Sequence, residues 1–141
     1  MANENLENLV KTGSLKSEAP ARDEIAGLIS SGLAKLTDAK NDTLSMESRF
    51  DLAYNAAHAL SLAALRHTGY RSESRYMVFQ CLNHTLALPH EQCRVLDKAH
   101  NKRNMAEYEG VIDIDEALVE ALIRATDEVA ERVSRISDDQ G

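Results

Sequence analysis

The amino-acid sequence predicts an all-α fold, namely an up-and-down bundle of four long helices plus one short inserted helix. In four long segments the apolar residues recur three or four positions apart, and the linkers between these segments are short. No segment alternates between apolar and polar residues between hairpin turns, so we expect no strand. At 141 residues, the chain fits one domain with its own core.

The first long helix is expected over residues 21–40, where apolar side chains form a stripe along one face. Gly27 and Gly32 lower the helix propensity of this segment by about 1 kcal/mol each relative to alanine. Their expected use is the close approach of a neighbouring helix.

The second long helix is expected over residues 46–67, because Ser45 can cap its start and Gly69 follows its end. Its apolar residues cover much of its circumference, which predicts burial on more than one side. Within it, we interpret His58 as a core or boundary histidine.

A short third helix is expected over residues 74–86, and Arg71 and Arg75 lead into it. Cations at a helix start oppose its dipole, which is a mild indication that these arginines have another partner. Solvation at the surface is the simpler interpretation.

Two further helices complete the bundle. Residues 89–110 begin with a proline and end with a glycine, as helices often do. The last helix is expected to begin near Ile114, with Asp113 and Glu116 as an acidic capping pattern, and to run to Ile136.

The two ends of the chain lie outside the predicted bundle domain, which spans residues 21–136. Residues 1–20 are mostly polar and are expected to form a mobile N-terminal arm or a loosely docked helix. Residues 137–141 are expected to form a frayed tail.

Composition limits the setting of the protein. No apolar run is long enough to cross a membrane, and the N-terminus lacks the basic and apolar segments of a secretory signal. Cys81 and Cys93 lie in helical patterns without paired spacing, so we expect both to be reduced and buried. Together these features predict a cytoplasmic protein.

Charge is unevenly distributed along the chain, whose formal net charge is -7. Residues 66–103 hold seven Lys or Arg against three Asp or Glu, whereas residues 107–141 hold three Arg against eleven acids. The overall charge argues against a generic nucleic-acid binder. The basic middle segment is compatible with a local anion-binding surface, or simply with solvated helix faces.

The densest polar chemistry lies on the helix expected over residues 89–110. His100, Asn104 and Tyr108 are spaced four apart and therefore share one face, and Arg103 follows His100 by three. Arginine can bind a phosphate through two hydrogen bonds, and histidine can transfer a proton near neutral pH. These residue types could act on a phosphodiester, although many surface helices show the same spacing.

No other chemistry is indicated. The sequence has no glycine-rich phosphate loop, no zinc spacing of Cys and His, and no Glu-x-x-His pair of a di-iron bundle. We therefore predict no cofactor and no metal site.

The segment from Arg103 to Tyr108, RNMAEY, resembles the R-N-x-x-x-H motif of prokaryotic HEPN domains. The resemblance implies a helical bundle that often dimerises through its motif helices, and metal-independent RNase activity in members of toxin–antitoxin or defence systems. Arg103 and Asn104 match the motif, whereas Tyr108 stands where the family has histidine. Tyrosine is a poor proton carrier at neutral pH, because its unperturbed pKa is about 10.

Three functions follow as alternatives. The first is a HEPN-like module that binds RNA or a nucleotide without cleaving it, through Arg103 and Asn104 with help from Lys102 and Arg71. The second is an active RNase that uses Arg103 with His100 or Tyr108. The third is a structural or protein-interaction bundle, as a homodimer or as the acidic partner of a basic protein.

Overall fold

The structure is a computed structural model that describes residues 4–110 and 113–139. It confirms the all-α bundle. The long helices are α2 (Arg22–Ala39), α3 (Met46–Thr68), α6 (His90–Glu109) and α7 (Glu116–Asp139). None of the described helices combines the length and the apolar character needed to cross a bilayer.

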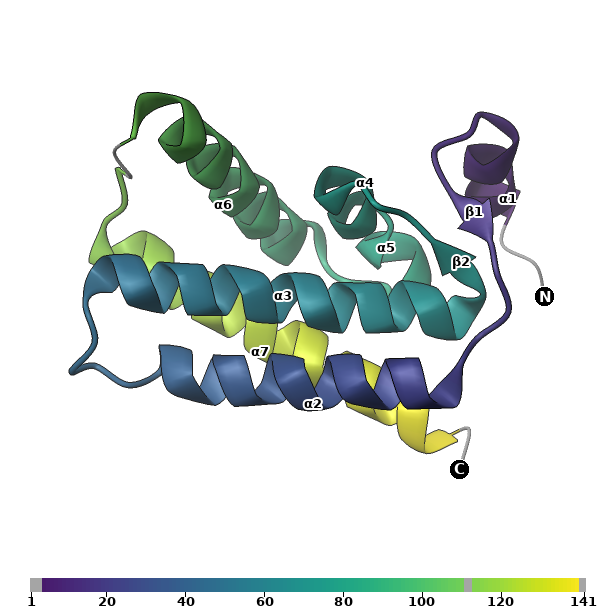
Figure 1. The fold of residues 1–141 in the computed structure, drawn as a ribbon, viewed down its shortest axis with the longest axis horizontal. Helices are drawn as coiled ribbons and strands as arrows, with labels where there is room; N and C mark the ends of the chain where they lie inside the picture. Colours follow the sequence, from purple (N-terminus) through teal and green to yellow (C-terminus); the bar gives the residue numbers. More distant parts are fainter. Residues whose placement is uncertain (1–3, 111–112, 140–141) are drawn as a thin grey trace.

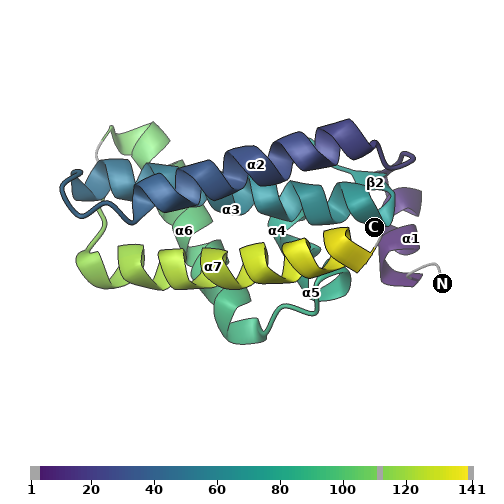
Figure 2. The same cartoon turned by 90° about the horizontal axis from the view of Figure 1, so that it is seen from below.

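Helix α3 is the centre of the bundle. Figure 1 shows α2 and α3 side by side and antiparallel, with α7 crossing behind them and α6 leaning away from α3. Figure 2 shows the molecule from below, with α7 running alongside α2 and α3. Eleven residues of α3 are buried, from Phe50 to Arg66, which confirms that this helix is covered on more than one side.

Both ends of α3 are fixed as predicted. The Ser45 hydroxyl accepts a hydrogen bond from the Ser48 backbone N–H, and Gly69 ends the helix in the left-handed conformation, with φ 100°. The start of α7 differs from the prediction. The cap is Asp115, whose Oδ1 accepts from the Leu118 N–H at 2.8 Å, so Asp113 is not the capping residue.

The short third helix was predicted as one segment, and this is wrong. The structure has two pieces, α4 (Arg75–Gln80) and α5 (Leu82–Thr85). The prediction of no strand is also wrong. The two-residue strands β1 (Lys16–Ser17) and β2 (Tyr70–Arg71) pair in antiparallel fashion. They are too short to give an alternating pattern that a sequence could reveal.

One glycine of α2 sets the distance between α2 and α3. A Cβ on Gly32 would lie 2.6 Å from Cγ of Leu60, so the close approach predicted there is confirmed. The same prediction is wrong for Gly27, where a Cβ would meet nothing within 4 Å.

The N-terminal segment contains helix α1 (Glu4–Lys11) and packs against the far end of α3. Leu6 is fully buried in a second apolar cluster, separate from the main core. The other buried members of this cluster are Leu15, Leu65, Tyr70, Val78 and Cys81. Residues 4–20 therefore have a defined place against α3 and α4, and the mobility of this arm stays a prediction.

Buried Arg66 ties that segment to the bundle. Its side chain is 1% exposed and donates hydrogen bonds to the carbonyl oxygens of Glu18 and Ala19 and to Oε1 of Glu24, at 2.7–2.9 Å. Arg71 binds the carboxylates of the same two glutamates. Two arginines are thus matched by two carboxylates, an arrangement we call the Arg66 lock.

Candidate functional site

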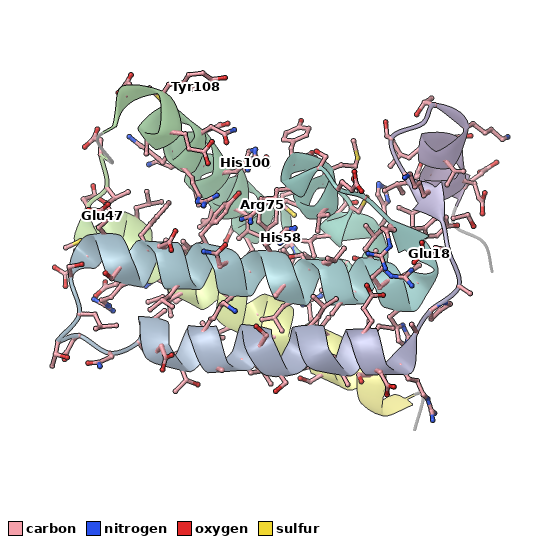
Figure 3. The ribbon with its side chains drawn as sticks, viewed as in Figure 1. Glu18, Glu47, His58, Arg75, His100 and Tyr108 are labelled. Carbon is pink, nitrogen blue, oxygen red and sulfur yellow. The ribbon has the colours of Figure 1, made fainter. Side chains whose placement is uncertain are left out.

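The expected ridge on α6 is only partly a cluster. His100 and Asn104 contact each other, with 3.1 Å between Nε2 of the imidazole and Nδ2 of the amide. Tyr108 is 92% exposed and lies at the far end of α6, away from the other polar groups (Figure 3). Shared helical spacing therefore places Tyr108 on the same face without bringing it into a site.

Arg103 lies across the ring of Tyr54, a buried residue of α3. Its guanidinium carbon is 4.9 Å from the ring centroid, a cation–π contact. Its ion pairs are loose, at 3.7 Å to Oδ1 of Asp51 and 3.8 Å to Oε1 of Glu107. The motif arginine is thus oriented mainly by an aromatic ring of another helix.

A second guanidinium reaches the same ring from α4. The Arg75 guanidinium carbon is 5.5 Å from the Tyr54 centroid, and its Nη1 donates to the neutral Oδ1 of Asn55 at 3.1 Å. Among the described carboxylates, none forms an ion pair with Arg75. Arg75 is therefore a half-buried cation whose charge is not matched by a nearby acid.

His100 is held between α3 and α6 in one defined tautomer. Tyr54 Oη lies 2.9 Å from Nδ1, on the other side of the imidazole from Asn104. With the Asn104 amide nitrogen as the donor, Nε2 accepts and the ring proton is assigned to Nδ1, facing Tyr54. Burial lowers the pKa of His100, Asp97 opposes this shift, and Arg75 and Arg103 add to it. The ring is therefore neutral at physiological pH.

His58 is the second imidazole of this site. Its ring packs edge-on against Phe79, with centroids 6.1 Å apart. Burial, followed by the charges of Arg75 and Arg103, lowers its pKa to about 4. The low pKa therefore has two causes: the imidazole is partly shielded from water, and two positive charges lie near it.

These residues form one group, which we call the Tyr54 cluster: Tyr54, His58, Arg75, His100 and Arg103. Figure 3 shows Arg75, His58 and His100 gathered above α3, between α4 and α6. The capping Ser74 hydroxyl, which accepts from the Met77 N–H, fixes the start of α4 and so places Arg75.

Two predicted binding residues lie outside the cluster. Arg71 belongs to the Arg66 lock at the other end of α3, near Glu18 in Figure 3. Lys102 points to Asp113, with Nζ 3.4 Å from Oδ2. The structure therefore does not bring all the basic residues of the middle segment into one patch.

Arg103 also lines an acidic cavity of about 380 Å³ that no other member of the Tyr54 cluster lines. Its charged lining consists of the carboxylates of Glu47, Asp51 and Glu107, against Arg103 alone. An anion is disfavoured there, so the anion-binding potential belongs to the Tyr54 side. The described residues contain no group of three side chains able to hold a metal ion.

The sequence predicts His100, Arg103 and Asn104 as site residues, but neither Tyr54 nor Arg75. Tyr54 has the position of a core residue, and its role depends on which side chains cross over it. The only available signal for Arg75 is a cation at a helix start, where it opposes the helix dipole.

The chain matches no protein-family model, no curated protein and no solved structure.

Proposed function

We propose that this protein is a HEPN-like module that binds RNA or a nucleotide through phosphate and does not cleave it. The observation that supports this most is the convergence of Arg75 and Arg103 on Tyr54, with Arg75 free of a carboxylate partner among the described residues. Two guanidinium groups that contact the same ring suit the several oxygens of a phosphate.

The local electrostatics favour an anion. Arg75 and Arg103 both lower the pKa of His58, so the positive charges of the two arginines act on the same part of the cluster. The site is partly buried, and charge–charge interactions are stronger there than in bulk water. Binding of a phosphate is therefore expected to raise the pKa of His58.

The geometry supports binding better than cleavage. Tyr108, which stands where the motif has histidine, is exposed and distant from the cluster. Both ring nitrogens of His100 are engaged, by Tyr54 and Asn104, and its lowered pKa disfavours the imidazolium form that a general acid needs. An active RNase would have to break one of these two contacts.

An RNA assay tests the proposal. Labelled RNA is incubated in chelator with the purified protein and with Arg75→Ala, Arg103→Ala and Arg124→Ala, and both retention and cleavage are scored. Arg124 is an exposed arginine of α7 and serves as the matched control. We expect salt-sensitive retention, weakened about 10- to 100-fold by each cluster substitution and unchanged by the control.

The outcomes separate the alternatives. Retention that is equal in all four proteins contradicts phosphate binding at the Tyr54 cluster. Cleavage that disappears in Arg103→Ala supports an active RNase instead. A place in a toxin–antitoxin or defence system, and a cytoplasmic location compatible with the free thiols of Cys81 and Cys93, belong to the same proposal.

A second candidate function is protein interaction through the C-terminal half of α6. This half has no buried residue, and it exposes Met105 by 53% beside the exposed Tyr108. Such a surface favours a homodimer, or another protein partner, over a helix that only packs within its own chain. Sedimentation of the wild type and of Met105→Lys checks this: a dimer should dissociate in the variant, and a monomeric wild type would contradict self-association.

A further inference from the structure

Tyr76 is an exposed aromatic residue at the edge of the Tyr54 cluster. It follows Arg75 in the first turn of α4, and its side chain is 51% exposed. Its ring centroid is 6.0 Å from that of His100, with the rings tilted by 45°. The next aromatic residue of the helix, Phe79, is buried and supports His100 from below, with centroids 6.2 Å apart.

Packing does not account for the position of Tyr76. Phe79 already fills the apolar space under His100, and the Tyr76 hydroxyl makes no hydrogen bond to another described residue. About half of Tyr76 remains exposed to solvent, in a cluster that also holds Arg75, a cation with which no described carboxylate pairs. Flat aromatic faces next to arginines are the usual platforms for unpaired nucleobases.

We propose that Tyr76 is a nucleobase subsite, so that the ligand of the Tyr54 cluster is a nucleotide with its phosphate at Arg75 and Arg103 and its base stacked on Tyr76. This inference rests on the proposed phosphate binding and adds the class of group attached to that phosphate. Tyr76 and Arg75 reach the same cluster through different rings, with the Tyr76 ring 6.0 Å from His100 and the Arg75 guanidinium carbon 5.5 Å from the centroid of Tyr54.

Stacking on a single aromatic ring is tolerant of base identity, because every base has a flat π-face. The subsite therefore favours single-stranded or mononucleotide ligands over a duplex, in which the base faces are already stacked. It also predicts a contribution to affinity that is insensitive to salt, in contrast to the contribution of the two arginines.

The test compares three probes by titration calorimetry: inorganic phosphate, ribose 5-phosphate and adenosine 5′-monophosphate. The proteins are the wild type, Tyr76→Leu and Tyr76→Phe. We expect the adenosine monophosphate to bind wild type about 5- to 100-fold more tightly than ribose 5-phosphate. Tyr76→Leu should lose this difference, and Tyr76→Phe should keep it, while all three proteins bind inorganic phosphate equally.

Each other outcome has a definite meaning. Equal affinity for ribose 5-phosphate and the mononucleotide in wild type, with phosphate still bound, overturns the nucleobase subsite and leaves the phosphate site intact. A difference that survives in Tyr76→Leu places the base elsewhere and overturns the role of Tyr76. Absence of binding for all three probes overturns the proposed function, and this inference with it.

Discussion

Two pairs of arginines lie along α3, one pair at Tyr54 and the other near the C-terminal end of the helix, and they differ in how their charge is balanced. In the Arg66 lock, Arg66 and Arg71 meet the carboxylates of Glu18 and Glu24, with Nε–oxygen distances of 2.8 and 2.9 Å. In the Tyr54 cluster, the ion pairs of Arg103 measure 3.7 and 3.8 Å, and Arg75 pairs with no described acid.

This contrast separates an arginine that holds the fold together from one that can bind a ligand. A buried guanidinium with complete hydrogen bonding holds segments of the chain together. Removing either the guanidinium or its partners lowers the free energy of unfolding, because buried polar groups are then left unpaired. A guanidinium held by an aromatic ring and a neutral amide keeps its charge available to a ligand. In the sequence both pairs belong to one basic segment, because the sequence does not show which arginines form ion pairs with Glu18 and Glu24.

The largest expected effect concerns Arg66. Replacing it with methionine fills a similar volume but leaves the carbonyl oxygens of Glu18 and Ala19 without their donor. The free energy of unfolding should fall by about 3–5 kcal/mol. Urea denaturation measures it, and a loss below about 1 kcal/mol would break the assignment of Arg66 as a structural lock.

A smaller loss is expected from Glu24→Gln, which removes one of the two carboxylates of the lock. We expect about 2 kcal/mol near neutral pH, the scale of hydrogen bonds to charged groups. Hydrogen bonds from Arg71 and Arg66 lower the pKa of Glu24 below 4.5 in the folded state. Its stabilisation is therefore present above pH 4.5 and lost as pH falls further.

Unfolding curves measured between pH 7 and pH 3 check this. The wild type should lose stability in the acidic range, and the Glu24→Gln curve should be flatter there. Parallel curves for the two proteins would mean that Glu24 is not the titrating group.

The Tyr54 cluster has a different pH window, because the lowered pKa belongs to a half-buried imidazole, His58, and not to a carboxyl group. His58 titrates at about 4 in the folded state and near 6.5 when unfolded, so the unfolded chain binds the proton first. Stability is fully present above pH 6.5 and falls toward pH 4, by roughly 1 kcal/mol per pH unit.

NMR titration of the histidine ring signals measures this directly. In Arg75→Met the pKa of His58 should rise while remaining below 6.5, since burial is the larger cause. A His58 pKa that does not move would show that the charge of Arg75 does not reach the imidazole.

The substitution Arg75→Met tests the stability contribution of the Tyr54 cluster. Arg75→Met should change the free energy of unfolding by less than about 0.5 kcal/mol, since this half-exposed residue gives up one hydrogen bond to a neutral amide and one cation–π contact. Urea denaturation beside Arg66→Met gives the contrast. A loss as large as that of Arg66→Met would make both pairs structural.

The bundle could be read from the sequence because its long helices have strong periodicity and well-defined ends. Ser45, Gly69 and Gly110 act where the sequence places them, since caps depend only on local backbone groups. The strands β1 and β2 could not be predicted, because each has two residues and forms only when segments more than fifty positions apart meet. The break between α4 and α5 likewise leaves no proline or glycine to mark it.

The candidate site could be predicted only in part. Helical spacing correctly brings His100 next to Asn104, because both lie on one helix. It cannot show that Tyr54 passes beneath Arg103, or that Arg71 is drawn away to Glu18 and Glu24, because those contacts depend on how helices cross.

The Arg66 lock also fixes where the protein can be shortened. A chain that began at residue 22 would retain every long helix, and by helical pattern alone it would look complete. It would nevertheless lack the backbone oxygens of residues 18 and 19, which receive the Arg66 guanidinium across more than forty positions of sequence. We therefore expect the smallest chain that folds by itself to include residues 18 and 19. In a series of N-terminal truncations, soluble expression should be lost when the deletion passes residue 18.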